Sequence, residues 1–118
     1  MTGKSSLLGA LVLFIIAPAI VKAQSIERVE PPSWFTGMKE TNLQLMIYGK
    51  ETGSLDVSTD YPGVRIVTTV KTGNPDYLFV NLDIGKEALP GNVPLVFKRG
   101  TTVINYNYPL HPLPGEPA

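Results

Sequence analysis

Apolar and polar residues alternate along several stretches of this chain. The clearest stretch is Leu43 to Tyr48, in which Leu43, Leu45 and Ile47 alternate with polar or larger side chains. A period of two places successive side chains on opposite faces of a β-strand. The same pattern, with aliphatic residues at every second position, recurs from Tyr77 to Ile84. Both stretches are therefore predicted to be strands with one buried face.

Turn-forming residues divide the chain into short segments of this kind. The predicted strands are Ile26 to Glu30, Leu43 to Tyr48, Leu55 to Ser58, Val64 to Lys71, Tyr77 to Ile84, Val93 to Phe97 and Thr102 to Leu110. Glycine or proline marks most of the turns, as in Tyr61-Pro62-Gly63, and no stretch shows the period of an amphipathic helix. The pattern predicts an all-β fold, an antiparallel immunoglobulin-like β-sandwich of about seven strands.

Each predicted strand has one face assigned to the core. From Val64 to Lys71 the inward residues are predicted to be Val64, Ile66, Thr68 and Val70. The β-branched residues in that strand favour the pleated conformation. The inward positions of the last two strands are Val93, Leu95, Phe97, Ile104, Tyr106, Tyr108 and Leu110. A core position is also the preferred interpretation for Phe79.

Two prolines interrupt the chain before its only tryptophan. Pro31 and Pro32 fix φ and supply no N–H donor, so the first strand is predicted to end there, in an extended corner. Trp34 and Phe35 follow, and Gly37 permits a turn. Two interpretations remain open: Trp34 fills one end of the core, or Trp34 or Phe35 is partly exposed as a platform for a sugar or a partner subunit. The two can coexist, with one ring in and one out.

The two ends of the chain differ from its middle. Residues 1–23 combine the basic Lys4, an apolar run of about 15 residues and small residues before Gln24, which predicts a cleavable signal peptide rather than a membrane anchor. Residues 24–110 are predicted to form the sandwich. Four prolines fall in the nine residues from Pro109, so regular pairing is predicted to stop there and residues 111–118 to form a linker or frayed tail.

The charge distribution and the lack of cysteine limit which partners and covalent links are expected. Without the leader, eight basic residues face ten acidic ones, a net charge of −2, and the basic residues are scattered. This distribution predicts no binding to nucleic acid or to an anionic membrane surface. The chain has no cysteine, so neither disulfides nor a lipid anchor is expected. A periplasmic or secreted product is predicted.

The sequence offers few residues that could form a known catalytic motif. The single histidine, His111, lies between a leucine and a proline, and nucleophile-elbow and zinc motifs are missing. Asp56, Asp60 and Asp83 are interpreted as solvated surface carboxylates rather than a glycosidase pair. We therefore assign no catalytic residue, metal ligand or cofactor to this chain, and leave open whether it has enzymatic activity.

Aromatic residues are the more informative class. Ring faces complement the C–H surfaces of pyranoses and contribute large burial energies at interfaces. The candidate carbohydrate- or partner-binding residues are Trp34, Phe35, Tyr61 and Tyr77.

Five segments in order, IERVEPPSWFTGM, LQLMIYGK, DYPGVRI, PDYLFVNLDI and VINYNYPL, span Ile26 to Leu110. Their order resembles the N-terminal domain of exported cyclomaltodextrinases and neopullulanases of the alpha-amylase superfamily. In that family the domain is an immunoglobulin-like sandwich before a catalytic (β/α)₈ barrel, similar to starch-binding modules. In dimers it packs near the partner's barrel and helps to shape the mouth of its active site.

The resemblance implies a non-catalytic module that assists binding of an α-glucan or cyclodextrin and contacts the catalytic barrel of the same or a partner chain. It directs attention to Trp34, Phe35, Gly37, Met38 and Tyr61, whereas the catalytic carboxylates of the barrel have no counterpart in this sequence. The alternative is a resemblance of V-x-P-P-S and the following strand to IPT or TIG modules, which are spacers or adhesion units of surface proteins.

Overall fold

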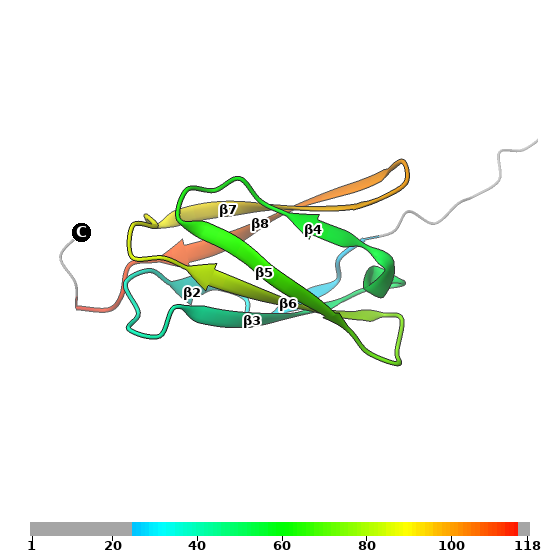
Figure 1. Ribbon diagram of the computed structural model, residues 1–118, viewed down its shortest axis with the longest axis horizontal. Helices are drawn as coiled ribbons and strands as arrows, with labels where there is room; N and C mark the ends of the chain where they lie inside the picture. The colour runs from blue at the N-terminus through cyan, green and yellow to red at the C-terminus, as the bar shows by residue number, and fades with distance from the viewer. Residues whose placement is uncertain (1–24, 116–118) are drawn as a thin grey trace, which may run out of the picture.

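Two four-stranded sheets pack face to face (Figure 1). The computed structural model describes residues 25–115, so the predicted signal peptide and the last three residues lie outside the described residues. The elements are β1 (Arg28–Glu30), β2 (Trp34–Phe35), β3 (Asn42–Tyr48), the 3₁₀ turn η1 (Thr52–Ser54), β4 (Asp56–Ser58), β5 (Val64–Lys71), β6 (Tyr77–Ile84), β7 (Gly91–Arg99) and β8 (Thr102–His111). The predicted all-β sandwich is confirmed.

The first sheet has the strand order β1-β3-β6-β5 and the second has the order β2-β8-β7-β4. Pairing is antiparallel except between β2 and β8, which run parallel. The two-residue strand β2 was not predicted. Trp34 and Phe35 pair with Leu110 and His111, and the Thr36 N–H donates to the His111 carbonyl at 2.9 Å. The proline corner therefore ends β1, as predicted, and also carries the chain from the first sheet to the second.

The core consists of the inward residues of both sheets. β6 shows the alternation most clearly, because each of its aliphatic residues is buried and each residue between them is partly exposed. The buried hydrophobic residues are Val29, Leu43, Leu45, Ile47, Leu55, Val64, Leu78, Val80, Leu82, Ile84, Ala88, Val93, Leu95, Phe97, Tyr108 and Leu110. The predicted inward sets of β3, β6 and β7 are confirmed, while Ile104 and Tyr106 of β8 pack against the core as partly buried residues.

The predicted inward face of β5 is wrong in its second half. Ile66 pairs with Leu82, but Thr68 pairs with the next residue of β6, Asn81, so Val67 is an extra residue at a β-bulge. The extra residue exchanges the two faces of the strand beyond this point. Thr68 and Val70 therefore point outward, and Val70 is 45% exposed. 

Phe79, also predicted to lie in the core, is on the outer face as well. It is in register with Val70 of β5 and Met46 of β3. Its neighbours along β6, Leu78 and Val80, are fully buried, so the ring lies on the opposite side of the sheet from them.

The expectation that the prolines prevent regular pairing from Pro109 onward is wrong, whereas the strand predicted from Thr102 to Leu110 is nearly right. β8 continues to His111, and Pro109 is in register with Asn92 of β7. β2 pairs with β8 only from Leu110 onward, so β8 has no β2 partner at Pro109. A proline is tolerated where one side of a strand has no ladder to complete.

Tyr108 joins the core to the proline corner. Its ring is fully buried, and its hydroxyl donates to the Pro31 carbonyl at 2.9 Å. Burial raises the pKa of the Tyr108 phenol above its ordinary value, and the nearby Tyr106 and Glu30 raise it further. The buried hydroxyl therefore stays protonated and bonded under conditions in which an exposed tyrosine ionises.

Replacing Tyr108 with phenylalanine is expected to lower the free energy of unfolding by about 1 kcal/mol at pH 8, because the Pro31 carbonyl loses its partner. Above pH ~10 the phenol ionises in the unfolded chain but not in the folded one, so the wild type loses stability that the variant keeps. The difference between the two proteins should therefore shrink as the pH rises. Urea unfolding at pH 8 and pH 11 measures it, and a constant difference would contradict the assignment.

Candidate functional site

Three of the four candidate aromatic residues lie at the end of the sandwich where β8 finishes. Trp34 is in register with the buried Leu110, which places its side chain on the core side of the sheet. The indole is half-buried and packs against the core. The structure thus agrees with the interpretation in which Trp34 fills one end of the core.

Phe35 points the other way. It is in register with the exposed His111, and the two ring centroids are 6.4 Å apart. The Trp34 and Phe35 rings are 5.9 Å apart and tilted by 54°. One ring of the corner therefore closes the core, while the other, half-buried, lies on the outer surface beside the histidine.

Tyr61 closes the same end from the turn before β5. Its hydroxyl donates to the Leu89 carbonyl at 2.6 Å, and its ring packs against the core. Tyr61, Pro62, Glu87 and Leu89 line a small hollow of about 190 Å³. Leu89 is 72% exposed, which makes it the most exposed of the large hydrophobic side chains in residues 25–115.

Tyr77 lies at the opposite end of the sandwich. It begins β6 and is in register with Tyr48, the last residue of β3, with 5.0 Å between the two ring centroids. The Arg28 guanidinium lies 5.6 Å from the centroid of the Tyr48 ring. Trp34, by contrast, pairs near the end of β8, so β2 and the start of β6 lie at opposite ends of the sandwich (Figure 1). The four candidates therefore do not form one continuous platform.

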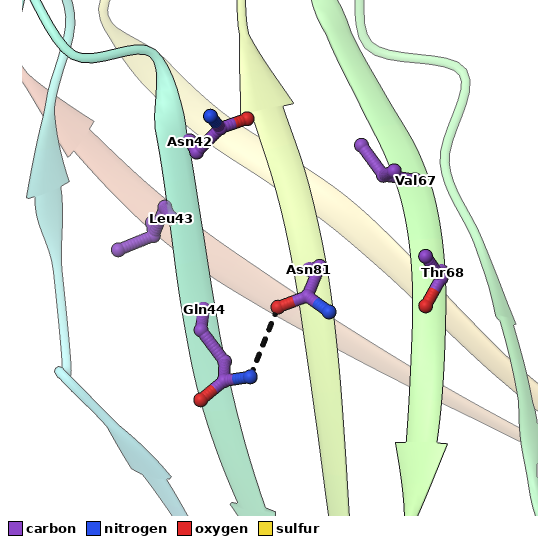
Figure 2. A pocket seen from close by; sticks show the side chains of 6 residues that line it. All are labelled: Asn42, Leu43, Gln44, Val67, Thr68 and Asn81. Carbon is purple, nitrogen blue, oxygen red and sulfur yellow. Dashed lines mark hydrogen bonds between the residues drawn. The ribbon is translucent and has the colours of Figure 1, made fainter.

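The outer face of the first sheet carries a polar site that sequence reasoning missed. Gln44, Asn81 and Thr68 lie side by side in register across β3, β6 and β5, and Gln44 Nε2 donates to Asn81 Oδ1 at 3.0 Å (Figure 2). An open hollow of about 460 Å³ lies over them. We call this site the amide hollow, and its lining residues are Asn42, Leu43, Gln44, Val67, Thr68 and Asn81. Alternation alone predicts that Gln44 and Asn81 point outward, but not that they meet.

In residues 25–115, two of the acidic residues considered in the sequence, Asp56 and Asp83, lie on different sheets. Asp56 is on β4 of the second sheet and Asp83 is on β6 of the first, where it lies 3.6 Å from Arg65. Within the same range no group of three or more histidine or acidic residues could hold a metal ion. No helix in this part of the chain is long and apolar enough to cross a bilayer.

A family model described as "Cyclomaltodextrinase, N-terminal" matches residues 28–112. The match starts at the first residue of β1 and ends one residue after β8, so it includes every strand of both sheets. It agrees with the first of the two resemblances found in the sequence. The chain therefore belongs to the family of cyclomaltodextrinase N-terminal domains.

Proposed function

We propose that this chain is the non-catalytic N-terminal module of a secreted α-glucan hydrolase of the alpha-amylase family, of the cyclomaltodextrinase or neopullulanase type. Its role is to assist binding of an α-glucan or cyclodextrin and to contact the catalytic barrel of the same or a partner chain. The observation that carries the proposal is the family match over all the strands, 28–112.

The strand order supports an immunoglobulin-like topology for the module. If β1, β3, β4, β5, β6, β7 and β8 are named A to G in chain order, the first sheet reads A-B-E-D and the second reads G-F-C. This is the strand arrangement of constant-type immunoglobulin domains. β2 then adds a short strand beside G.

A supporting rather than catalytic role agrees with the positions of the carboxylates. Glycoside hydrolysis requires two carboxyl groups about 5 to 10 Å apart that face each other across the scissile bond. Asp56 and Asp83 belong to different sheets, and Asp83 is on the outer face with Arg65. We therefore place the reaction outside residues 25–115, in a catalytic barrel of the same or a partner chain.

The candidate contact with that barrel is the end of the sandwich that carries Phe35, His111 and Leu89. Phe35 and Leu89 offer apolar surface there, and the chain leaves β8 at the same end. A barrel that follows in the same chain would attach next to these residues. The apolar run and small residues before Gln24 support export to the periplasm or medium, and intact mass of the purified product would show whether residues 1–23 are removed.

Titration calorimetry of the purified protein with maltoheptaose and β-cyclodextrin tests the binding role. We expect weak binding with a dissociation constant on the order of 1 mM, about −4 kcal/mol, because the exposed surfaces are shallow. Cellohexaose, which has the same sugar residues in β-linkage, is the control and should bind less. Absence of heat with both α-glucans at concentrations up to about 10 mM would overturn the glucan-binding role.

A further inference from the structure

We propose that the amide hollow is a binding site for one or two residues of a neutral oligosaccharide. The inference rests on the proposed function, which makes an α-glucan the natural ligand, but its residues differ from the four aromatic candidates. Three features of the outer face of the first sheet carry it: a paired set of amides, an apolar row beside them, and the lack of charge in the lining.

The amides are held in place and still have bonding capacity. The bond from Gln44 Nε2 to Asn81 Oδ1 fixes both side chains relative to each other. It leaves Gln44 Oε1 as an acceptor and Asn81 Nδ2 as a donor with no side-chain partner in residues 25–115. Sugar hydroxyls both donate and accept hydrogen bonds, so this acceptor and this donor, which lie on opposite sides of the bonded pair (Figure 2), suit hydroxyls of one or two sugar residues.

The bulge in β5 shapes the hollow. Val67, the extra residue of the bulge, and Thr68 both line it, opposite Asn42 and Gln44 of β3 (Figure 2). Bulges often redirect side chains next to functional sites. The volume of about 460 Å³ lies within the range of small-ligand sites. Val67 is 45% exposed, so a ligand in the hollow would cover apolar surface that now faces water.

An apolar row lies next to the amide row. Met46, Phe79 and Val70 are in register across the same three strands, two residues along from Gln44, Asn81 and Thr68. Rows two residues apart on one face of a sheet are separated by about 7 Å. A sugar residue bonded to the amides would therefore have the half-buried Phe79 and the exposed Val70 within reach of its C–H face.

Charge selects a neutral ligand. The lining side chains are amides, a hydroxyl and aliphatic groups, with no cation for a phosphate or carboxylate and no anion for a basic peptide. The charged residues in the row of Asn42 on this face are Arg65 and Asp83, and they form an ion pair with each other at 3.6 Å. The amide of Asn42 donates to Glu40 Oε1 at 3.0 Å, which leaves Gln44 and Asn81 as the principal recognition groups.

The test measures maltoheptaose binding by calorimetry for the wild type and four variants. Asn81→Ala and Gln44→Ala remove the two recognition groups, and Val67→Arg obstructs the hollow from an exposed position. Asn105→Ala is the matched control, because Asn105 is an exposed strand asparagine on the outer face of the second sheet. We expect about tenfold weaker binding for the first three variants and less than a twofold change for the control. Thermal melting confirms that each variant is folded.

The outcomes separate this inference from the proposed function. If the wild type binds maltoheptaose and the variants at 44, 67 and 81 bind equally well, the amide hollow is not the site and the proposed function stands. If the wild type binds only cellohexaose, and Asn81→Ala abolishes that binding, the hollow is a sugar site and the α-glucan assignment falls. Binding of neither sugar overturns both. A dimer that Val67→Arg dissociates while maltoheptaose affinity is unchanged would assign this face to a protein contact instead.

Discussion

Replacing Phe97 with alanine is expected to lower the free energy of unfolding by about 3 to 5 kcal/mol, the largest effect of any single core truncation in this domain. Phe97 is fully buried and is, with Tyr108, one of the two largest such side chains. Its neighbours in register are Val57 of β4 and Ile104 of β8, and it belongs to the core between the two sheets, so its removal leaves a cavity there. The free energy of unfolding of a small domain is about 5 to 15 kcal/mol, so the variant is expected to be close to unfolded at 37 °C.

Urea unfolding followed by tryptophan fluorescence measures this effect. With a slope of about 2 kcal/mol per M, the midpoint should fall by about 2 M. Phe35→Ala is the matched control, since it removes the same atoms from a half-buried ring beside the exposed His111. Phe35→Ala should lower the free energy of unfolding by about 1 kcal/mol. Equal shifts for Phe97→Ala and Phe35→Ala would mean that the core does not extend through β7 as described.

The second large effect is expected at Gly63, where replacement by alanine should lower the free energy of unfolding by about 3 kcal/mol. Gly63 has a φ of 84°, in the left-handed region, as the third residue of the turn that starts at Tyr61. An added Cβ would lie 2.7 Å from both the Cα and the N of Ala88, so backbone must move. That backbone is tied down, because Ala88 N–H donates to the Gly85 carbonyl and Gly85 N–H donates to the Gly63 carbonyl at 2.7 Å.

Gly37→Ala separates the two causes of this cost. Gly37 has nearly the same φ, 79°, but nothing lies within 4 Å of the added Cβ. It should therefore show only the backbone strain, about 1 kcal/mol, while Gly63→Ala also shows the clash with the 85–88 loop. Melting temperatures of both variants test this, and an equal loss at the two glycines would contradict the close contact between Gly63 and Ala88.

The strands could be predicted from the sequence because one face of each is buried against the other sheet. From Leu43 to Ile47 and from Leu78 to Ile84, for example, the predicted inward residues are the buried ones. The errors arise where pairing decides the outcome. Val67 becomes a bulge only in the context of β6, and Pro109 is tolerated because of where β2 ends. Neither the bulge nor the paired proline could be predicted from the local sequence pattern.

The candidate sites also combine features that the local sequence predicts with features that only strand pairing decides. The sequence identified Trp34 and Phe35 as a corner and left open which ring faces the core. The register of β2 with β8 places Trp34 on the core side and Phe35 on the outer side, and both rings are half-buried. It did not identify the amide hollow, because Gln44 and Asn81 are 37 positions apart and meet only through the register of β3 with β6. Outward polar residues are common on strands, and only their neighbours distinguish a site from ordinary surface.

The parallel pairing of β2 with β8 has a mechanical consequence. β2 lies near the start of the fold and β8 is its last strand, so tension between residues 25 and 115 pulls the two strands along their common axis in opposite directions. Hydrogen bonds loaded in this way, including the one from Thr36 to His111, share the force and break together, whereas an antiparallel hairpin opens one bond at a time. We therefore expect this short contact to resist separation of β2 from β8 under tension.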